Sequence, residues 1–176
     1  GVFTSGSIGF LSSALACISL ATRFCVNNPS QIFLDALAES RKIKIKNKVF
    51  LLGNQHTFPV AMYGAAKLYE ILGIDAHYER IEQFSHMGLF CAKKGDTVII
   101  FEQKNKHNLQ LVRTLRKIGL NTILVEPKTK DKVSAILFFI FVSQLVPLYH
   151  AKARHQKECY FINSKKIRAA SSDMIY

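Results

Sequence analysis

Three side chains that can carry acid–base chemistry follow closely on one another in this chain: Lys67, Glu70 and His86. A carboxylate can take a proton from a carbon beside a carbonyl group and return it to the neighbouring carbon. A cation one helical turn away can keep that carboxylate ionised or stabilise an oxygen anion. An imidazole titrates near neutral pH and can give a proton to an oxygen atom. Together the three residue types indicate proton transfer at a carbonyl compound.

The segment just before these residues has the features of an anion-binding turn. The apolar run 49–52 is followed by Gly53-Asn54-Gln55-His56-Thr57 and then by Pro59, which is allowed in the first turn of a helix. Turns of this kind, between a strand and a helix, aim backbone N–H groups at anions. We therefore expect the turn residues to bind substrate, with the side chain of His56 exposed. They are Gly53, Asn54, Gln55, His56 and Thr57.

Each acid–base residue also has a structural interpretation. Lys67 and Glu70 are three residues apart, so on a helix surface they would form an ion pair worth about 0.2–0.5 kcal/mol. A single histidine such as His86 more often has a structural role than a catalytic one. The residues alone leave both interpretations open.

Short apolar runs alternate with amphipathic segments from residue 48 onward. The predicted strands are 49–53, 75–80, 97–101 and 121–125, and the predicted helices are 59–72, 82–90, 105–118 and 131–153. Strands that alternate with helices in this way favour a parallel sheet with helices on both faces. The sequence thus predicts the α/β class, as a three-layer α/β/α sandwich with a mainly parallel, doubly wound sheet.

The N-terminal third predicts two further helices, at 8–24 and 31–43. The turn-forming residues 27–30 separate them, and Asn28 or Ser30 could cap the second helix. Residues 155–176 show little periodicity and are expected to run along the surface. We therefore divide the chain into a terminal helix (1–28), an α/β domain (29–154) and a C-terminal tail (155–176).

The strand, turn and helix resemble the SIS (sugar isomerase) domain family, in particular the second SIS domain of glutamine–fructose-6-phosphate transaminases. Residues 53–61 are similar to the family text G-R-G-x-x-Y-P-x-A, and 65–70 to A-L-K-L-K-E. Residues 83–88 correspond to E-x-x-H-G-P, with Gln83 in place of the glutamate. Residues 9–14 are similar to the text that closes the first SIS domain of these proteins, which implies that the chain corresponds to the C-terminal part of a two-domain arrangement.

The resemblance implies an SIS-like fold and a phosphosugar ligand of the fructose-6-phosphate or glucosamine-6-phosphate class. It implies that Glu70 is the proton-shuttling base, that Lys67 supports it, and that His86 reaches the site of a neighbouring subunit in a homodimer. Ser12 matches a position that contacts the sugar, although a small residue in this helix could equally serve packing. The implied activity is isomerisation, deamination or transamination of a sugar phosphate, in amino-sugar metabolism. No cofactor is expected, and no metal site is expected because His150 and His155 have no Cys or Asp partner in step with them. The alternative is a module that senses a phosphosugar without converting it.

Charge raises the question of a polyanionic partner, because 24 Lys and Arg against 12 Asp and Glu give a net charge of +12. The lysines are scattered along the sequence, at 42–48, 104–106, 128–132 and 165–166, and no aromatic residues alternate with them. A solvated surface is therefore the preferred interpretation, and no nucleic-acid partner is expected. Attraction of a dianionic sugar phosphate is compatible with the same charge.

Cysteine spacing and hydropathy bear on the compartment. Cys17, Cys25, Cys91 and Cys159 are widely separated and form no C-x-x-C pair, which favours a reducing cytoplasm over a disulfide framework. The apolar run at 135–142 is too short to cross a bilayer and is predicted to be a buried helix, so no membrane partner is expected.

Overall fold

The fold is built on a parallel sheet of four short strands. The computed structural model describes residues 7–21 and 23–175. The strands are Val49–Leu52 (β1), Ala76–Glu79 (β2), Thr97–Ile100 (β3) and Asn121–Leu124 (β4). They pair in the order β2-β1-β3-β4, and all three pairings are parallel. Each strand falls within its predicted range, so the predicted parallel α/β architecture is confirmed.

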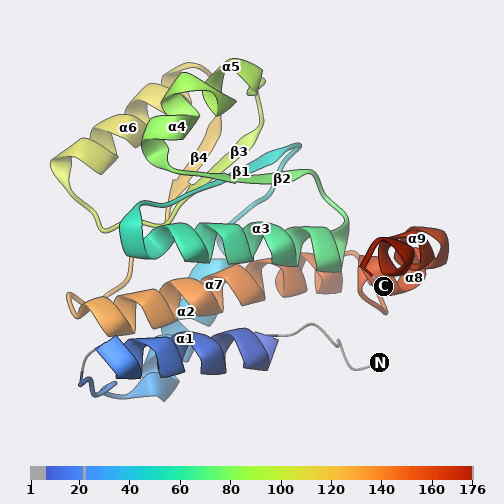
Figure 1. Cartoon of the computed structure of the whole chain (residues 1–176). Coiled ribbons are helices and arrows are strands. Elements are labelled where there is room, and N and C mark those ends of the chain that lie inside the picture. The colour runs from blue at the N-terminus through green and yellow to red at the C-terminus, as the bar shows by residue number, and fades with distance from the viewer. Residues whose placement is uncertain (1–6, 22, 176) are drawn as a thin grey trace.

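Helices cover both faces of this sheet (Figure 1). One side carries α4 (Ile81–His86), α5 (Gly88–Cys91) and α6 (Lys106–Lys117); the other carries α3 (Phe58–Leu72) and α7 (Lys132–Ala153), with α1 (Ser7–Ala21) and α2 (Pro29–Ser40) beyond them. A 3₁₀ turn, Gln55–Thr57, leads into α3, and the chain ends in α8 (Tyr160–Asn163) and α9 (Lys165–Ile175). The sheet is therefore the middle layer of the sandwich.

Alternation along the buried strands divides the core into two parts. In β1, Val49 and Leu51 pack on the α3 and α7 side, whereas Phe50 and Leu52 pack on the α6 side. All four side chains are buried, which explains the continuous apolar run, because a strand covered on both faces has no solvent side. Each such side chain stabilises the fold by about 1.5–3 kcal/mol through burial.

Helix α7 is the central helix of one layer. With 22 residues, the helix is long and apolar enough to cross a membrane, judged by length and composition alone. However, 56% of its most apolar 18-residue stretch is buried inside the fold. It packs against both α2 and α3, and the ring of Phe139 meets the ring of Phe101 at the end of β3 with centroids 5.8 Å apart. These contacts agree with the predicted buried helix.

The first two helices, predicted at 8–24 and 31–43, end earlier than predicted, at Ala21 and Ser40. Two further segments differ in kind from the prediction. The predicted helix 82–90 is interrupted at Met87, whose backbone (φ −132°, ψ −68°) is not helical, so α4 and α5 are separate. The tail, expected to run along the surface without periodicity, instead forms α8 and α9. The tail is held because Cys159, at the start of α8, is fully buried in the core on the α3 and α7 side.

The direction of α3 decides where the predicted site residues lie. Its first residue follows the turn after β1, at the carboxyl edge of the sheet, and the helix then runs towards the amino edge, from left to right in Figure 1. Lys67 and Glu70 come nine and twelve residues after Phe58, so they lie about 14 and 18 Å along the helix axis. The turn and the Lys67–Glu70 pair therefore stand at opposite ends of α3.

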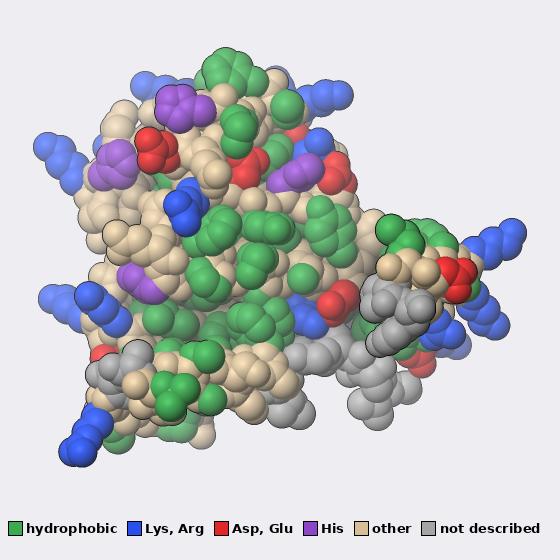
Figure 2. Space-filling model, viewed as in Figure 1, with side chains coloured by type: hydrophobic (Ala, Val, Ile, Leu, Met, Phe, Trp, Pro, Cys, Tyr) green, Lys and Arg blue, Asp and Glu red, His purple; other side chains and the backbone are tan. Residues whose placement is uncertain are grey.

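One face of the molecule is largely apolar (Figure 2). Hydrophobic side chains gather over α3, while most of the Lys and Arg side chains seen in this view stand around the outline. Met62 and Tyr69 on α3 are 43% and 46% exposed, and Leu20 on α1 is 89% exposed.

Candidate functional site

Lys67 and Glu70 form an ion pair with an unequal environment. The Nζ of Lys67 lies 2.5 Å from Oε2 of Glu70. The Lys67 side chain is only 4% exposed, whereas the Glu70 side chain is 40% exposed. A buried cation is costly unless it is paired, so this contact differs from the weak surface pair that the spacing alone would allow.

Three helices hold Lys67 in place. Its Nζ lies 5.2 Å from the centroid of the Tyr63 ring on the same helix. That ring stacks on Phe10 of α1, with centroids 3.7 Å apart, and the Tyr63 hydroxyl accepts a hydrogen bond from the Gln144 amide of α7 at 3.0 Å. The position of the ammonium group, and hence of the carboxylate that it binds, is set by the packing of α1, α3 and α7.

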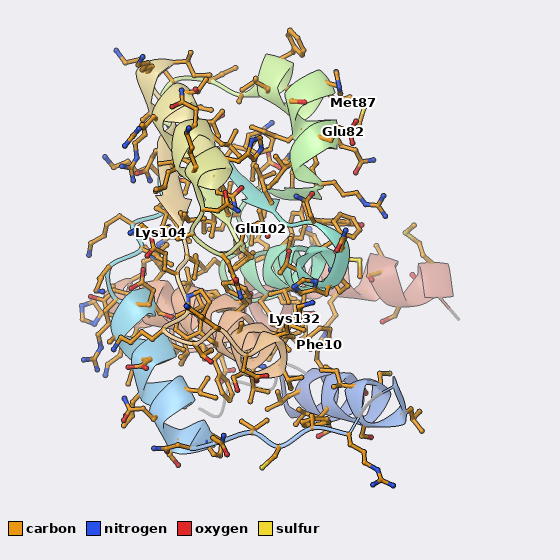
Figure 3. All side chains as sticks on the ribbon, turned by 90° about the vertical axis from the view of Figure 1, so that its left-hand side faces the viewer. Phe10, Glu82, Met87, Glu102, Lys104 and Lys132 are labelled. Atoms are coloured by element: carbon orange, nitrogen blue, oxygen red, sulfur yellow. The ribbon has the colours of Figure 1, made fainter. Side chains whose placement is uncertain are left out.

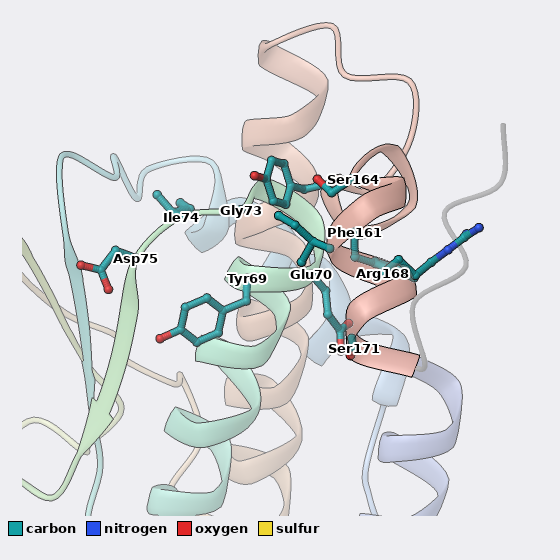
Figure 4. A pocket seen from close by; sticks show the side chains of 11 residues that line it. Tyr69, Glu70, Gly73, Ile74, Asp75, Phe161, Ser164, Arg168 and Ser171 are labelled. Carbon is teal, nitrogen blue, oxygen red and sulfur yellow. The ribbon is translucent and has the colours of Figure 1, made fainter. Parts of the chain in front are cut away.

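A cavity of about 520 Å³ opens beside Glu70. The end of α3 and the loop between α3 and β2 form one wall, and α8 and α9 form the other (Figure 4). In this view the Glu70 side chain points towards Ser171 of α9, whereas Arg168 extends away from the cavity. The lining residues are Tyr69, Glu70, Gly73, Ile74, Asp75, Tyr160, Phe161, Ser164, Ile167, Arg168 and Ser171.

Specific contacts hold the second wall, formed by α8 and α9, against the end of α3. Gly73 has φ 64°, and a Cβ there would lie 2.5 Å from the Tyr160 ring, so only glycine allows the ring this close. The Gln156 amide donates to the Ile71 carbonyl at 2.5 Å. Burial raises the pKa of the Cys159 thiol, and the nearby carboxylates of Glu70 and Glu158 raise it further. The tail is thus part of the site, which the sequence analysis missed because these contacts join residues far apart in the chain.

The predicted anion-binding turn already holds a carboxylate. The backbone N–H of Asn54 donates to Oε1 of Glu102 at 2.9 Å, and the Thr57 hydroxyl lies 2.8 Å from the same oxygen. Glu102 follows β3, next to β1 in the sheet, and lies near the middle of the carboxyl edge that faces the viewer in Figure 3. The geometry therefore agrees with an anion-binding turn, but the anion is a side chain of the chain itself.

Other features of the turn fit its position. A Cβ at Gly53 would lie 2.6 Å from the Thr57 carbonyl oxygen, which explains the glycine. Gln55 has φ 42°, an uncommon conformation for a residue with a side chain. His56 is exposed, as expected.

A second cavity, of about 670 Å³, lies on the carboxyl side between α4, α5 and α6. It contains Asn54 and Gln55 of the turn but neither Lys67 nor Glu70. Its lining is formed by Asn54, Gln55, Arg80, Ile81, Glu82, Phe84, Ser85, Leu89, His107, Leu111 and Leu115. The structure therefore separates the two halves of the site expected from the sequence into two cavities.

The remaining predicted residues lie apart from Glu70. His86 is exposed at the end of α4, and α4 covers the opposite face of the sheet from α3, so the two residues do not meet within one chain. Ser12 is exposed on α1. Within residues 7–21 and 23–175, no group of three His, Cys, Asp or Glu side chains is arranged to hold a metal ion.

Comparison with known proteins places this architecture. No protein-family model matches the chain, and no curated protein matches it in sequence. Among solved structures, it is similar to a glucosamine-6-phosphate deaminase from Thermotoga maritima, with 21% identity, a TM-score of 0.60, and coverage of 70% of this chain and 41% of the deaminase. It is also similar to the C-terminal domain of a glucosamine-fructose-6-phosphate aminotransferase from Francisella tularensis, with 20% identity and a TM-score of 0.53. This match covers 70% of this chain and 39% of the aminotransferase domain.

The chain has an SIS-like fold. A third structure of the same kind is a tagatose-6-phosphate ketose/aldose isomerase from Escherichia coli, with 15% identity, a TM-score of 0.51, and coverage of 70% of this chain and 42% of the isomerase. The chain spans about two fifths of the length of each of these three proteins. The resemblance seen in the sequence is therefore confirmed for the fold.

Proposed function

We propose that this SIS-like domain binds a phosphosugar in the cavity beside Glu70 and that Glu70 acts as the base of an aldose–ketose isomerisation. The observation that carries the proposal is the pairing of a half-exposed carboxylate with a buried lysine at the wall of a cavity. The substrate class is fructose-6-phosphate or glucosamine-6-phosphate. The names of two similar structures, a glucosamine-6-phosphate deaminase and a glucosamine-fructose-6-phosphate aminotransferase, support this class.

We assign each residue of the pair a role. Oε2 of Glu70 is held by Lys67, while Oε1 makes no hydrogen bond among the described residues and is available to substrate. Oε1 takes the proton from C2 of the open-chain aldose, the C–H electrons form the C1–C2 double bond, and the electrons of the C1 carbonyl move to O1 to give an enediolate. The proton of the C2 hydroxyl passes to O1, Oε1 returns its proton to C1, and C2 becomes the carbonyl carbon. Lys67 holds the carboxylate in this orientation.

The rest of the cavity can hold the sugar. The hydroxyl groups of Ser164 and Ser171 can form hydrogen bonds with the sugar. The Tyr69 side chain lies on the other side of Glu70 from Ser171 (Figure 4). Arg168 extends into solvent from α9, so it would have to turn inwards to meet a phosphate group. A change of this rotamer is a small movement for an exposed side chain.

His86 enters this proposal through a second copy of the chain. Because His86 lies on the opposite face of the sheet from Glu70, it can assist ring opening only from a neighbouring subunit. We therefore propose a homodimer, in which the exposed apolar residues of α1 and α3 become buried. Light scattering that gives the monomer mass at working concentrations would contradict the dimer.

A sensing module is the second candidate function. The observation in its favour is Glu102, which occupies the N–H of Asn54, so that a phosphate group gains no anchor at the turn after β1. A domain without that anchor could bind a phosphosugar without converting it. The two functions differ in turnover and not in binding.

The deciding experiment measures binding and turnover on the same protein. Calorimetry with fructose-6-phosphate and glucosamine-6-phosphate reports binding, and NMR of the sugar carbons reports isomerisation. Glu70→Gln should bind substrate nearly as well as the wild type but lose isomerisation, because an amide has the same shape and cannot accept the proton. Glu126→Gln, which changes another half-exposed, lysine-paired carboxylate far from the cavity, is the matched control and should keep the rate.

Each outcome has a distinct meaning. Isomerisation by Glu70→Gln at the wild-type rate would remove the catalytic role of Glu70. Binding by the wild type without any turnover would favour the sensing module. Absence of binding to either sugar phosphate would contradict the proposed ligand.

A further inference from the structure

Lysines that are scattered in the sequence meet at the amino edge of the sheet. Val49, Thr97 and Asn121 are paired in register as the first residues of β1, β3 and β4. The loops that precede them therefore lie side by side. Their basic residues are Arg41, Lys42, Lys44, Lys46 and Lys48 before β1, Lys93 and Lys94 before β3, and Arg116 and Lys117 before β4. We call these residues the basic edge.

Hydrogen bonds fix the loops of the basic edge to one another. The Lys46 N–H donates to the Thr97 hydroxyl oxygen at 2.8 Å, and the Asn121 side-chain amide donates to the Lys44 carbonyl at 2.8 Å. The Gly95 N–H donates to the Gly119 carbonyl at 2.9 Å. The backbone that carries the lysines is thus held in place, while the side chains of all of them except Lys48 are exposed.

Most of this charge is not neutralised. Glu39 pairs with Lys42 at 2.9 Å and Asp75 pairs with Lys48 at 3.3 Å. Asp96 is buried and accepts the backbone N–H of Lys93. The exposed lysines of the edge that make no ion pair with any described carboxylate are Lys44, Lys46, Lys93, Lys94 and Lys117.

A purely local role explains only part of the cluster. Lys117 lies in the last turn of α6, where a cation offsets the partial negative charge of the helix end. Lys44, Lys46, Lys93 and Lys94 lie in loops, beyond the helices. Like charges held close together repel one another, so an anionic partner would relieve this arrangement.

We propose that the basic edge binds the phosphate backbone of double-stranded nucleic acid without reading its sequence. Adjacent strands are about 4.8 Å apart, so the loops before β1, β3 and β4 spread their charges over about 10 Å, a span that covers several phosphates of a duplex. This replaces the expectation of no nucleic-acid partner, which rested on the scatter of the lysines along the sequence.

The composition of the edge selects the duplex over other polyanions. Single strands are bound by stacking on aromatic rings, and the segments 41–48, 93–96 and 116–120 contain no aromatic residue. The ring beside them, that of Tyr149, has the Lys44 ammonium group 5.7 Å from its centroid. An interface with an acidic protein would need an apolar centre. Within these three segments only one large apolar side chain, that of Ile118, is exposed, which is too little to form such a centre. The proposal does not depend on the phosphosugar site.

Fluorescence anisotropy with two unrelated duplexes and a single strand, over about 50–200 mM salt, tests the proposal. Five phosphate contacts predict a slope of about −4.5 for log affinity against log salt, equal for both duplexes, with weaker binding of the single strand. A quadruple variant removes four of the five charges: Lys44→Gln, Lys46→Gln, Lys93→Gln and Lys94→Gln. Its salt slope should become shallower, about −1, and its affinity for the duplex should fall at least tenfold. Circular dichroism checks that the variant is folded.

The matched control removes the same charge from the carboxyl side, where Figure 3 shows Lys104 and Lys132. Lys104→Gln, Lys106→Gln, Lys130→Gln, Lys132→Gln should keep most of the slope and the affinity. Equal losses in the two variants would reduce the effect to net charge and overturn the assignment of the edge. Absence of duplex binding at low salt, or tighter binding of the single strand or of an acidic protein, would also overturn it.

Discussion

Lys67 is buried, and its ammonium group lies 2.5 Å from the carboxylate of the half-exposed Glu70. One member of the pair thus belongs to the core and the other to a cavity wall. A pair of this kind links the packing of the domain to the group that could do chemistry, because any shift of Lys67 also moves Glu70.

The first prediction concerns the stability of the domain. Glu70→Gln leaves the buried Lys67 ammonium without an anion, so we expect the free energy of unfolding to fall by about 1–3 kcal/mol. The loss is smaller than for a fully buried pair because Glu70 remains partly solvated. Adding Lys67→Met, which removes the buried charge and keeps a similar shape, should recover most of the loss. Urea denaturation of both variants measures this, and a double variant less stable than Glu70→Gln alone would contradict it.

The second prediction concerns the tail. Gly73→Ala places a Cβ against the Tyr160 ring and forces a left-handed backbone conformation on alanine. We therefore expect α8 to lose its packing against the end of α3. Hydrogen exchange at the amides of residues 160–163 should rise, while exchange in β1 and β3 stays low. Gly9→Ala, where a Cβ meets open space, is the control. Unchanged protection of α8 in Gly73→Ala would show that the packing of α8 does not depend on this contact.

The third prediction concerns pH. Burial lowers the pKa of His150, the cations Arg154 and Lys44 lower it further, and its hydrogen bond with the Ile43 carbonyl acts in the opposite direction. The unfolded chain therefore takes up the proton first, so stability is retained above the ordinary imidazole pKa of 6.5 and is lost as the pH falls below it. His150→Gln should flatten the unfolding free energy between about pH 6.5 and pH 5. His107→Gln is an exposed control, and an unaltered slope in His150→Gln would contradict the assignment.

Local features of the sequence were enough to predict most of the fold. The run 49–52 predicts a fully buried strand because it has no polar position, and the three-residue spacing of Lys67 and Glu70 predicts a shared helix face. The length of the predicted helix 59–72 already implies that the turn before it lies far from its last turn. The sequence analysis instead joined the turn and the pair because they are close in the chain.

Contacts between distant residues account for what was not predicted. Glu102 reaches Asn54 across 48 residues, and no local pattern indicates which anion fills the turn. The contact of Tyr160 with Gly73, which turns the tail into a cavity wall, likewise appears only when the chain folds. Lys46 lies against Thr97 because β1 and β3 are paired, although α3, β2 and α4 lie between them in the sequence.

The position of the ligand tests the central claim most directly, because the two cavities lie at opposite ends of α3. Titration of the ¹⁵N-labelled protein with fructose-6-phosphate, followed by amide chemical shifts, maps the bound ligand. We predict saturable shifts at Tyr69, Gly73 and Ser164, around Glu70, with little change at Gln55 and Ser85. Shifts confined to Gln55 and Ser85 in the carboxyl-edge cavity, or no shifts at all, would contradict the account.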